Sequence, residues 1–399
     1  MLTASAMRHL DALLAFFVAT AAAALLTPLA GWFARRVGAM ADPSEMGLAR
    51  EKTPQLGGLA IFAAALLAAA IWMPEGKDAT VTRAILGGAA AITLVGALDD
   101  IFELKPLVKL SGQIGAALIA VVVGNVKVVD LTIPFLGTPQ FAHWLGAVLT
   151  VIWLVGIMNA VNFIDGVDGL AAGLVAIDGV AFTIIAFELK GPNSTPAGIL
   201  AAVTAGAALG FLFHNFNPAS IFMGDSGANL LGYLIGVVTV QGTLKTNAAI
   251  ALVAPLVILA VPFLDTGFVV AKRLKYGRKP WSKDASHFHH RMARIGFSQR
   301  KTVLYMYAWT ALLAGFAVAE RVVPWHRHGH YHVGWAILMV AVGLVALAGS
   351  VYVVYVLEIF KFKRLRAQDL RRAEPTTSEH QIEVRVQREV ETGEFETVG

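Results

Sequence analysis

Aspartates interrupt an otherwise apolar sequence, and they are the residues best suited to chemistry. Asp99 and Asp100 stand side by side in the stretch ALDDIFELKPLVKLSGQ, where they end one apolar run, and Lys109 lies in the run that follows. Consecutive residues on a helix point about 100° apart, so the two carboxylates suit separate tasks such as metal binding and proton transfer. The alternative for such a pair is a solvated helix end without a function.

Four polar residues recur at every third position in the stretch NAVNFIDGVDGLAAG: Asn159, Asn162, Asp165 and Asp168. Neighbouring members of such a series share one face of a helix. The spacing does not fit a calcium-binding loop, because the twelfth position from Asp165 is Ala176 and not a glutamate. Polar groups at the edge of a bilayer are costly without partners, so ligand binding is favoured over simple helix capping.

Asp225 lies between Gly224 and the pair Ser226-Gly227, directly before another apolar run. The first backbone N–H groups of a helix have no partner within it and carry a partial positive charge. An anion can therefore bind beside the carboxylate at this position. The alternative is that Asp225 only caps its own helix.

The stretch KPWSKDASHFHHRM contains His287, His289, His290 and Arg291 within a strongly basic segment. Imidazole and guanidinium groups bind and neutralise phosphate oxygens. Zinc is a competing hypothesis, but the chain has no cysteine and Asp284 is the obvious additional ligand nearby. Phosphate binding is therefore favoured for this segment.

The elements that must position these residues are membrane-spanning helices. Of 399 residues, 57% are hydrophobic and 15% are charged, whereas an ordinary soluble domain has about 25% charged residues. The absence of cysteine excludes disulfides and thiolate metal sites. Apolar stretches of about 20 residues are long enough to cross a bilayer. We predict an all-α polytopic integral membrane protein with about eleven transmembrane helices, at residues 10–33, 56–73, 83–98, 107–123, 143–160, 169–189, 196–214, 227–243, 247–270, 302–321 and 333–359.

The distribution of Lys and Arg predicts the orientation of these helices. One set of alternate loops carries 24 of the 32 Lys and Arg. By the positive-inside rule these loops are cytoplasmic, which places the N-terminus outside and the C-terminus in the cytoplasm. All four polar clusters then lie at cytoplasmic helix ends or in cytoplasmic loops. The 24 basic residues lie in residues 34–55, 99–109 and 271–301 and in the tail after 359.

Two parts are predicted, a transmembrane domain over residues 1–360 and a tail over residues 361–399. The tail begins with the basic run KFKRLRAQDLRR, which suits anionic lipid headgroups, and ends in a polar, acidic sequence. Such a sequence cannot bury a core, so we predict disorder beyond about residue 373. Residues 126–137 alternate like a short pair of strands.

Taken together, the motifs resemble those of the polyprenyl-phosphate N-acetylhexosamine-1-phosphate transferases, a family that includes the phospho-N-acetylmuramoyl-pentapeptide translocase. The similarity covers residues 52–290 through KTPQLGG, Asp99-Asp100 with Pro106 and Lys109, NAVNFIDGVDGLAAG, FMGDSG, PFLDT at 262–266 and HFHHR. The histidine motif is similar to that of the branch that uses UDP-N-acetylglucosamine. The chain departs from this branch in its first motif, where Lys52 and Gln55 stand at positions that often carry Pro and Arg.

The resemblance implies that the phosphate of a polyprenyl phosphate attacks the β-phosphorus of a UDP-sugar, which gives polyprenyl-diphospho-sugar and UMP. The implied cofactor is Mg²⁺, with Mn²⁺ as an alternative. The implied metal ligands are Asp225, Asp99 and Asp100. These three residues, His289 and His290 are the implied catalytic residues. Substrate binding is assigned to Lys52, Lys109, Asn159, Asn162, Asp165, Asp168, His287 and Arg291.

The implied partners are a UDP-N-acetylhexosamine, a polyprenyl (undecaprenyl or decaprenyl) phosphate and the lipid bilayer, with a homodimer as an option and no nucleic acid. The implied location is the inner membrane of a bacterium, where the product starts lipid-linked cell-envelope glycan synthesis. The alternatives are a phospho-N-acetylmuramoyl-pentapeptide transferase and a polytopic transporter of lipids or ions. Transport is disfavoured because the acids cluster at one interface and not near the midplane of the membrane.

Overall fold

The computed structural model of the chain describes residues 4–41, 52–73, 79–128, 142–188, 194–243, 299–323, 326–327, 330–331, 333–351, 367, 370–372 and 377–392. Internal contacts define two compact units, residues 1–260 with 310–324 and residues 261–309 with 325–399. These units do not coincide with the predicted division at residue 360.

The described part of the chain is almost entirely helical. The helices of the first unit are α1 (Ala4–Val37), α3 (Gly57–Trp72), α4 (Ala79–Phe102), α5 (Pro106–Leu118), α6 (His143–Ile164), α7 (Leu170–Glu188), α8 (Ser194–Asn215) and α9 (Gly224–Val238). Two π-helical segments, η2 (Ile119–Val123) and η3 (Thr239–Thr243), extend α5 and α9. The remaining elements are α13 (Gln299–Val322), α14 (Val333–Val351), α16 (Glu379–Thr392) and the strand pairs β1 (Met40–Ala41) with β2 (Thr53–Pro54) and β3 (His326–Arg327) with β4 (His330–Tyr331).

Seven of the described helices are long and apolar enough to cross a membrane, and α3 and α14 contain shorter apolar helices. The predicted all-α polytopic membrane fold is therefore confirmed. The helices also coincide with the predicted spans, apart from the span predicted at 247–270 and the end of the last one, which lie outside the described residues. The seven segments that are long and apolar enough to cross are Arg8–Val37, Ala79–Phe102, Pro106–Val123, His143–Ile164, Leu170–Glu188, Thr195–Asn215 and Gln299–Ala319.

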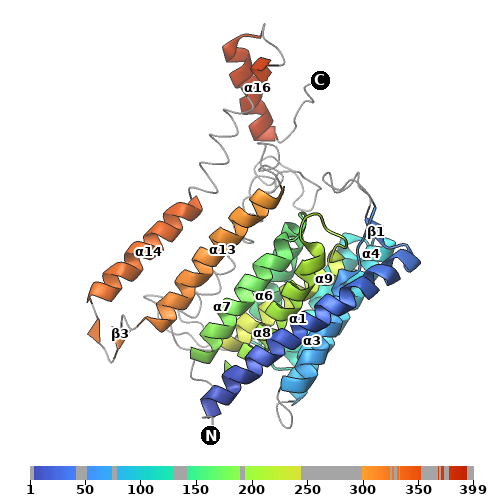
Figure 1. Cartoon of the computed structure of the whole chain (residues 1–399), viewed down its shortest axis with the longest axis vertical. Helices are drawn as coiled ribbons and strands as arrows, with labels where there is room; N and C mark the ends of the chain where they lie inside the picture. Colours follow the sequence, from blue (N-terminus) through green and yellow to red (C-terminus); the bar gives the residue numbers. More distant parts are fainter. Residues whose placement is uncertain are drawn as a thin grey trace. The chain divides into compact units, whose positions relative to one another are not determined.

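Helix α9 lies in the interior of the first unit, between α3, α4, α6 and α8, whereas α1 packs along α8 and α3 (Figure 1). Every residue from 226 to 238 is buried. A helix that is apolar on all sides is covered either by other protein elements or by lipid, and here protein elements cover it. The position of α9 is consequently determined by protein contacts on every side.

Two glycines allow the N-terminal end of α9 to approach its neighbours closely. A Cβ atom at Gly58 of α3 or at Gly96 of α4 would overlap main-chain atoms of residues 225–227. Small residues at helix contacts in membranes let backbones approach in this way. The first turn of α9 is thereby pressed against the last turns of α4.

The loop before α9 is paired with the KTPQLGG segment by main-chain hydrogen bonds. The N–H of Phe222 donates to the carbonyl of Pro54, and those of Gly57 and Gly58 donate to the carbonyls of residues 222 and 223. Strand β2 in turn pairs with β1, which follows α1. Loops distant in sequence are thus fixed at one end of the helix bundle.

Part of the tail, for which the sequence predicts disorder beyond residue 373, is helical in the described residues. Helix α16 packs Ile382 and Val386 against Leu370, and Arg371 forms an ion pair with Glu379. Residues four apart share one face of a helix, so the tail offers one narrow apolar stripe despite its polar composition. Of the strand pair predicted at 126–137, residues 126–128 are described and form no strand, and the others lie outside the described residues.

Replacing Gly96 by alanine should destabilise the protein by about 1–3 kcal/mol, because the new Cβ meets backbone that cannot rotate away. Gly156→Ala is the matched control, since nothing lies within 4 Å of a Cβ at Gly156. There the higher helix propensity of alanine should leave stability unchanged or raise it by up to about 1 kcal/mol. The midpoint of thermal unfolding in detergent measures both, and equal shifts would show that the close approach at Gly96 is unimportant.

Candidate active site

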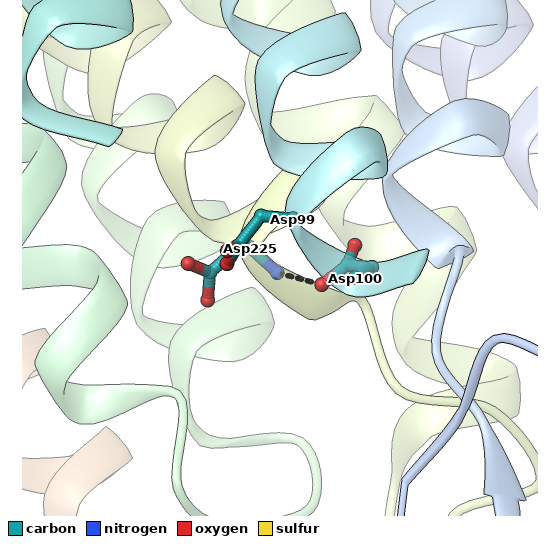
Figure 2. Close-up of side chains that lie close together, drawn as sticks. All are labelled: Asp99, Asp100 and Asp225. Atoms are coloured by element: carbon teal, nitrogen blue, oxygen red, sulfur yellow. Dashed lines mark hydrogen bonds between the residues drawn. The ribbon is translucent and has the colours of Figure 1, made fainter. Parts of the chain in front are cut away.

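Three aspartates meet where the end of α4 contacts the start of α9. Asp99 and Asp100 lie in the last turn of α4, and Asp225 lies in the first turn of α9. Each offers one carboxylate oxygen such that the three atoms lie within 4.8 Å of one another. Figure 2 shows the three side chains at the junction of the two helices. Residues that are more than a hundred positions apart in sequence thus form one acidic centre.

Asp100 caps the N-terminus of α9 from a different helix. Its carboxylate accepts the N–H of Asp225 at 2.8 Å, the bond drawn in Figure 2, and the N–H of Ser226 at 3.2 Å. The residue before the helix, Met223, provides no side-chain cap. Gly224 has a φ of +69°, and a Cβ there would overlap the Asp100 carboxylate. The anion that the N-terminus of α9 was predicted to bind is therefore Asp100 itself.

Lys109 links two of the three aspartates. It lies in the first turn of α5, and its ammonium group forms ion pairs with Asp99 and, at 2.9 Å, with Oδ2 of Asp225. The other oxygen of Asp225 accepts the side-chain N–H of Asn162 on α6 at 2.9 Å. Asp99, which is 6% exposed, also accepts the N–H of Leu104 at 2.8 Å. Charge-assisted bonds of this kind fix the orientation of each carboxylate.

The loop between α6 and α7 contributes two further aspartates with different surroundings. Asp168 accepts hydrogen bonds from the side chain of Asn217 at 2.9 Å and from the N–H of Ala219 at 3.1 Å. Gly169, at φ +80°, donates its N–H to the side chain of Asn215. Asp168 and Gly169 therefore fasten this loop to the segment that follows α8.

Asp165 is half-buried and directly follows α6. Burial raises the pKa of its carboxyl group well above the ordinary value, and repulsion from neighbouring carboxylates, led by Asp225 and Asp100, adds to the shift. Perturbed carboxyl groups of this kind are concentrated at functional sites. The environment of Asp165 is thus consistent with a place at the substrate and not in the framework.

Comparison with known proteins places this arrangement in a family. The profile described as "Glycosyl transferase family 4" matches residues 82–243, a range that contains all three aspartates of the centre. A Bacillus subtilis protein named probable undecaprenyl-phosphate N-acetylglucosaminyl 1-phosphate transferase is 39% identical over 305 residues, which cover 75% of this chain and 82% of that protein. The chain belongs to the polyprenyl-phosphate N-acetylhexosamine-1-phosphate transferase family.

Two further relatives have the same kind of name. The decaprenyl-phosphate N-acetylglucosaminephosphotransferase of Mycolicibacterium smegmatis is 37% identical over 327 residues, 75% of this chain and 80% of that protein. The undecaprenyl-phosphate alpha-N-acetylglucosaminyl 1-phosphate transferase of Escherichia coli O157:H7 is 27% identical over 326 residues, 79% of this chain and 85% of that protein. The resemblance seen in the motifs is confirmed, and the names agree on N-acetylglucosamine.

Only some of the site residues predicted for this chain lie together at the acidic centre. Lys109 and Asn162 contact Asp225 directly, whereas Asn159 contacts Gln113 of α5 at 2.8 Å and lies outside the acidic centre. Lys52 is exposed, and no hydrogen bond or ion pair of its side chain is seen within the described residues. The residues that lie outside the described ranges are His287, His289, His290 and Arg291, as well as the PFLDT motif.

Two polar residues at the site were not predicted as site residues. Gln55 donates its side-chain N–H to the carbonyl of Asp100 at 2.9 Å, and Asn229 donates to the carbonyl of Asp225 at 2.8 Å. Gln55 lies within the KTPQLGG motif, which is a signal for a role at the site. Asn229 follows Asp225 by one helical turn, a spacing that places both on one side of α9.

The donor set of the acidic centre fits a hard divalent cation. Oxygen ligands from carboxylates are those that Mg²⁺ and Mn²⁺ prefer. Asp99, Asp100 and Asp225 supply three carboxylates, and the described cation paired with them is Lys109. These three aspartates could therefore hold a metal ion, and Lys109 would then offset the remaining negative charge.

Lys109→Gln should destabilise the protein by about 1–3 kcal/mol at pH 7, because Asp99 and Asp225 would lose their positive partner. Unfolding is measured in EDTA so that no divalent cation replaces the ammonium group. Lys105→Gln, at an exposed lysine one turn away, is the control. Identical behaviour of the two variants would contradict the proposed linking role of Lys109.

Proposed function

We propose that the protein transfers N-acetylglucosamine-1-phosphate from UDP-N-acetylglucosamine to a polyprenyl phosphate and releases UMP. The observation that carries this proposal is the cluster of Asp99, Asp100 and Asp225 around Lys109, at the loop end of an apolar helix bundle. The names of the relatives support both the transferred group and the lipid acceptor. A site at the edge of a bundle of this kind can receive a lipid phosphate at headgroup level and a water-soluble nucleotide together.

The proposed reaction is a displacement at phosphorus. A phosphate oxygen of the lipid forms a bond to the β-phosphorus of the UDP-sugar, and the bond between that phosphorus and the oxygen bridging to the α-phosphate breaks. UMP leaves with this oxygen, and the lipid carries the diphospho-sugar. The main barrier to be lowered is repulsion between the two anions, so positioning and electrostatic stabilisation provide most of the catalysis.

We propose Mg²⁺ as the cofactor, with Mn²⁺ as a substitute, and Asp99, Asp100 and Asp225 as the residues that hold it. When bound, such an ion neutralises phosphate oxygens and so lowers the repulsion between the substrates. The ammonium group of Lys109 has a second function in this proposal, which is to contact a phosphate oxygen, because the Lys109 side chain is 38% exposed.

Asp225 is the central residue of the proposed site. Both of its oxygens have protein partners, Lys109 and Asn162, so the carboxylate is oriented before any substrate binds. Preorganised charges of this kind cost no rearrangement during the reaction. Asp99 or Asp100 would accept any proton carried by the attacking lipid phosphate.

The nucleotide is proposed to contact residues from three segments. The binding site for the nucleotide is proposed to be held or shaped by Asp165, Asp168, Asn159 and Asn162. Asp168 acts through its hydrogen bonds to the segment after α8, which fix the loop between α6 and α7. The diphosphate of the UDP-sugar is proposed to be bound by His287, His289, His290 and Arg291, with Lys52 as a further contact.

We further propose that the site faces the cytoplasm, with the N-terminus outside and the C-terminus cytoplasmic. The basic residues favour this orientation, because the cytoplasmic loops would carry 24 of the 32 Lys and Arg. The hydrogen bonds of residues 54–58 with the loop before α9, and the pairing of β2 with β1, support a common side for these segments. A homodimer stays a prediction.

The first test is release of UMP by the purified protein with UDP-N-acetylglucosamine, polyprenyl phosphate and Mg²⁺. Asp225→Asn should lower kcat by about 100- to 1000-fold, because it removes a charge that acts in the transition state. Glu103→Gln, at an exposed carboxylate just beyond α4, should keep full activity. If the unaltered protein releases no UMP, or if Asp225→Asn is fully active, the proposed function is wrong.

The second test is removal of the metal. EDTA should abolish UMP release, and Mg²⁺ or Mn²⁺ in excess should restore it, because carboxylates alone increase the repulsion between the anionic substrates. Asp99→Asn should need a higher metal concentration for half-maximal activity, since one ligand of the proposed set is lost. Full activity in EDTA would exclude the metal-dependent form of the mechanism.

A further inference from the structure

The residues that contact the Asp225 carboxylate have counterparts one helical turn deeper in the bundle. Asp225 is bound by Lys109 of α5 and Asn162 of α6, so one residue from each of three helices forms an upper layer. A lower layer consists of Gln113, Asn159 and Asn229. Gln113 lies four positions after Lys109, Asn159 lies three before Asn162, and Asn229 lies four after Asp225. In each helix this spacing places both residues on the same face.

The amides of the lower layer donate hydrogen bonds in one direction. Asn159 donates to Oε1 of Gln113 at 2.8 Å, and Gln113 donates through Nε2 to Oδ1 of Asn229 at 2.8 Å. Asn229 then donates to the main-chain carbonyl of Asp225 at 2.8 Å. The chain of donors therefore ends on the backbone of the residue whose side chain the upper layer holds.

Burial makes this chain of amides costly to interrupt. Gln113 is 6% exposed and Asn229 is 5% exposed, so an amide that lost its partner would find little water to replace it. Gln113 is the middle member and needs both of its functions, since it accepts from one asparagine and donates to the other. An apolar side chain at this position provides neither bond.

We propose that Gln113 is a positioning residue for the transferase reaction, acting through Asn229 on the backbone and hence on the carboxylate of Asp225. This inference rests on the proposed function. Asp225 is held at two points, at its carboxylate by the upper layer and at its carbonyl by the lower layer. Since Asn229 and Asp225 belong to the same helix, the first turn of α9 cannot rotate about the helix axis without breaking the buried bond from Gln113 of α5 to Asn229.

The proposal is tested by Gln113→Met, which keeps the length of the side chain and removes both hydrogen bonds. The value of kcat for UMP release should fall about 10- to 100-fold, because a small displacement of a reacting group has an effect of this size. The KM for UDP-N-acetylglucosamine should change less than kcat, because Gln113 reaches the proposed nucleotide site only indirectly, through its bond with Asn159. The matched control is Gln241→Met, at a buried glutamine of η3 whose Oε1 has no hydrogen-bond partner within the described residues. Its kcat should stay that of the unaltered protein.

A double-mutant cycle with Asn229→Leu tests the route of the effect. If Gln113 acts through Asn229, Gln113→Met should cause little further loss of kcat in the Asn229→Leu background. A purely structural role predicts a different pattern, in which Gln113→Met lowers the thermal midpoint but leaves kcat per folded molecule unchanged. Either that pattern or fully additive losses would overturn the proposal.

Hydrogen–deuterium exchange separates this proposal from the proposed function. Peptides that cover residues 222–232 should exchange faster in Gln113→Met than in Gln241→Met, because the first turn of α9 is less firmly held. If the unaltered protein is inactive but exchange is faster in Gln113→Met, the proposed function is rejected. The effect of Gln113 on the first turn of α9 is then still supported. If both exchange and kcat are unchanged in Gln113→Met, the proposal that Gln113 positions Asp225 is rejected.

Discussion

The site depends on one carboxylate that caps a buried helix. Helix α9 is buried from Ser226 onward, and an unpaired buried N–H costs about as much as a lost hydrogen bond. The carboxylate of Asp100, in the neighbouring helix α4, accepts the N–H groups of Asp225 and Ser226. That contact fixes the distance between α4 and α9, and it thereby places Asp225 beside Asp99. The lysine, the asparagines and the pairing of the loops are all arranged around this junction.

Composition and motifs predicted the membrane fold and the three aspartates of the centre, because both signals are local. Long apolar runs mark helices wherever they pack, and Asp99, Asp100 and Asp225 each stand at the end of such a run. The sequence also indicated the order of the helices along the chain. It could not indicate that α9 is the interior helix, because its apolar composition does not differ in kind from that of a helix facing lipid.

The partners of the polar residues were beyond prediction, since they depend on which helices are neighbours. Asn159 and Asn162 look equivalent in the NAVNFIDG motif, yet one contacts Gln113 and the other contacts Asp225. Asp168 belongs to the same series, and it fastens a loop through Asn217. A periodic pattern shows which residues share a helix face, but only packing shows what that face meets. The helix in the tail also depends on packing, because its apolar residues Ile382 and Val386 contact Leu370 from outside the helix.

The cap on α9 also constrains the order in which the protein can be made. The bond from Asp225 to Asp100 joins residues 125 positions apart, whereas Asp99 and Lys109 lie in consecutive helices. During synthesis the ion pair can form as soon as α5 has emerged from the ribosome. Asp100 has to wait until α6, α7, α8 and the start of α9 have been made, and until then its carboxylate lacks the N–H groups that it will bind. The acidic centre is therefore completed late in biosynthesis, when the helix that carries Asp225 enters between partners that are already in the membrane.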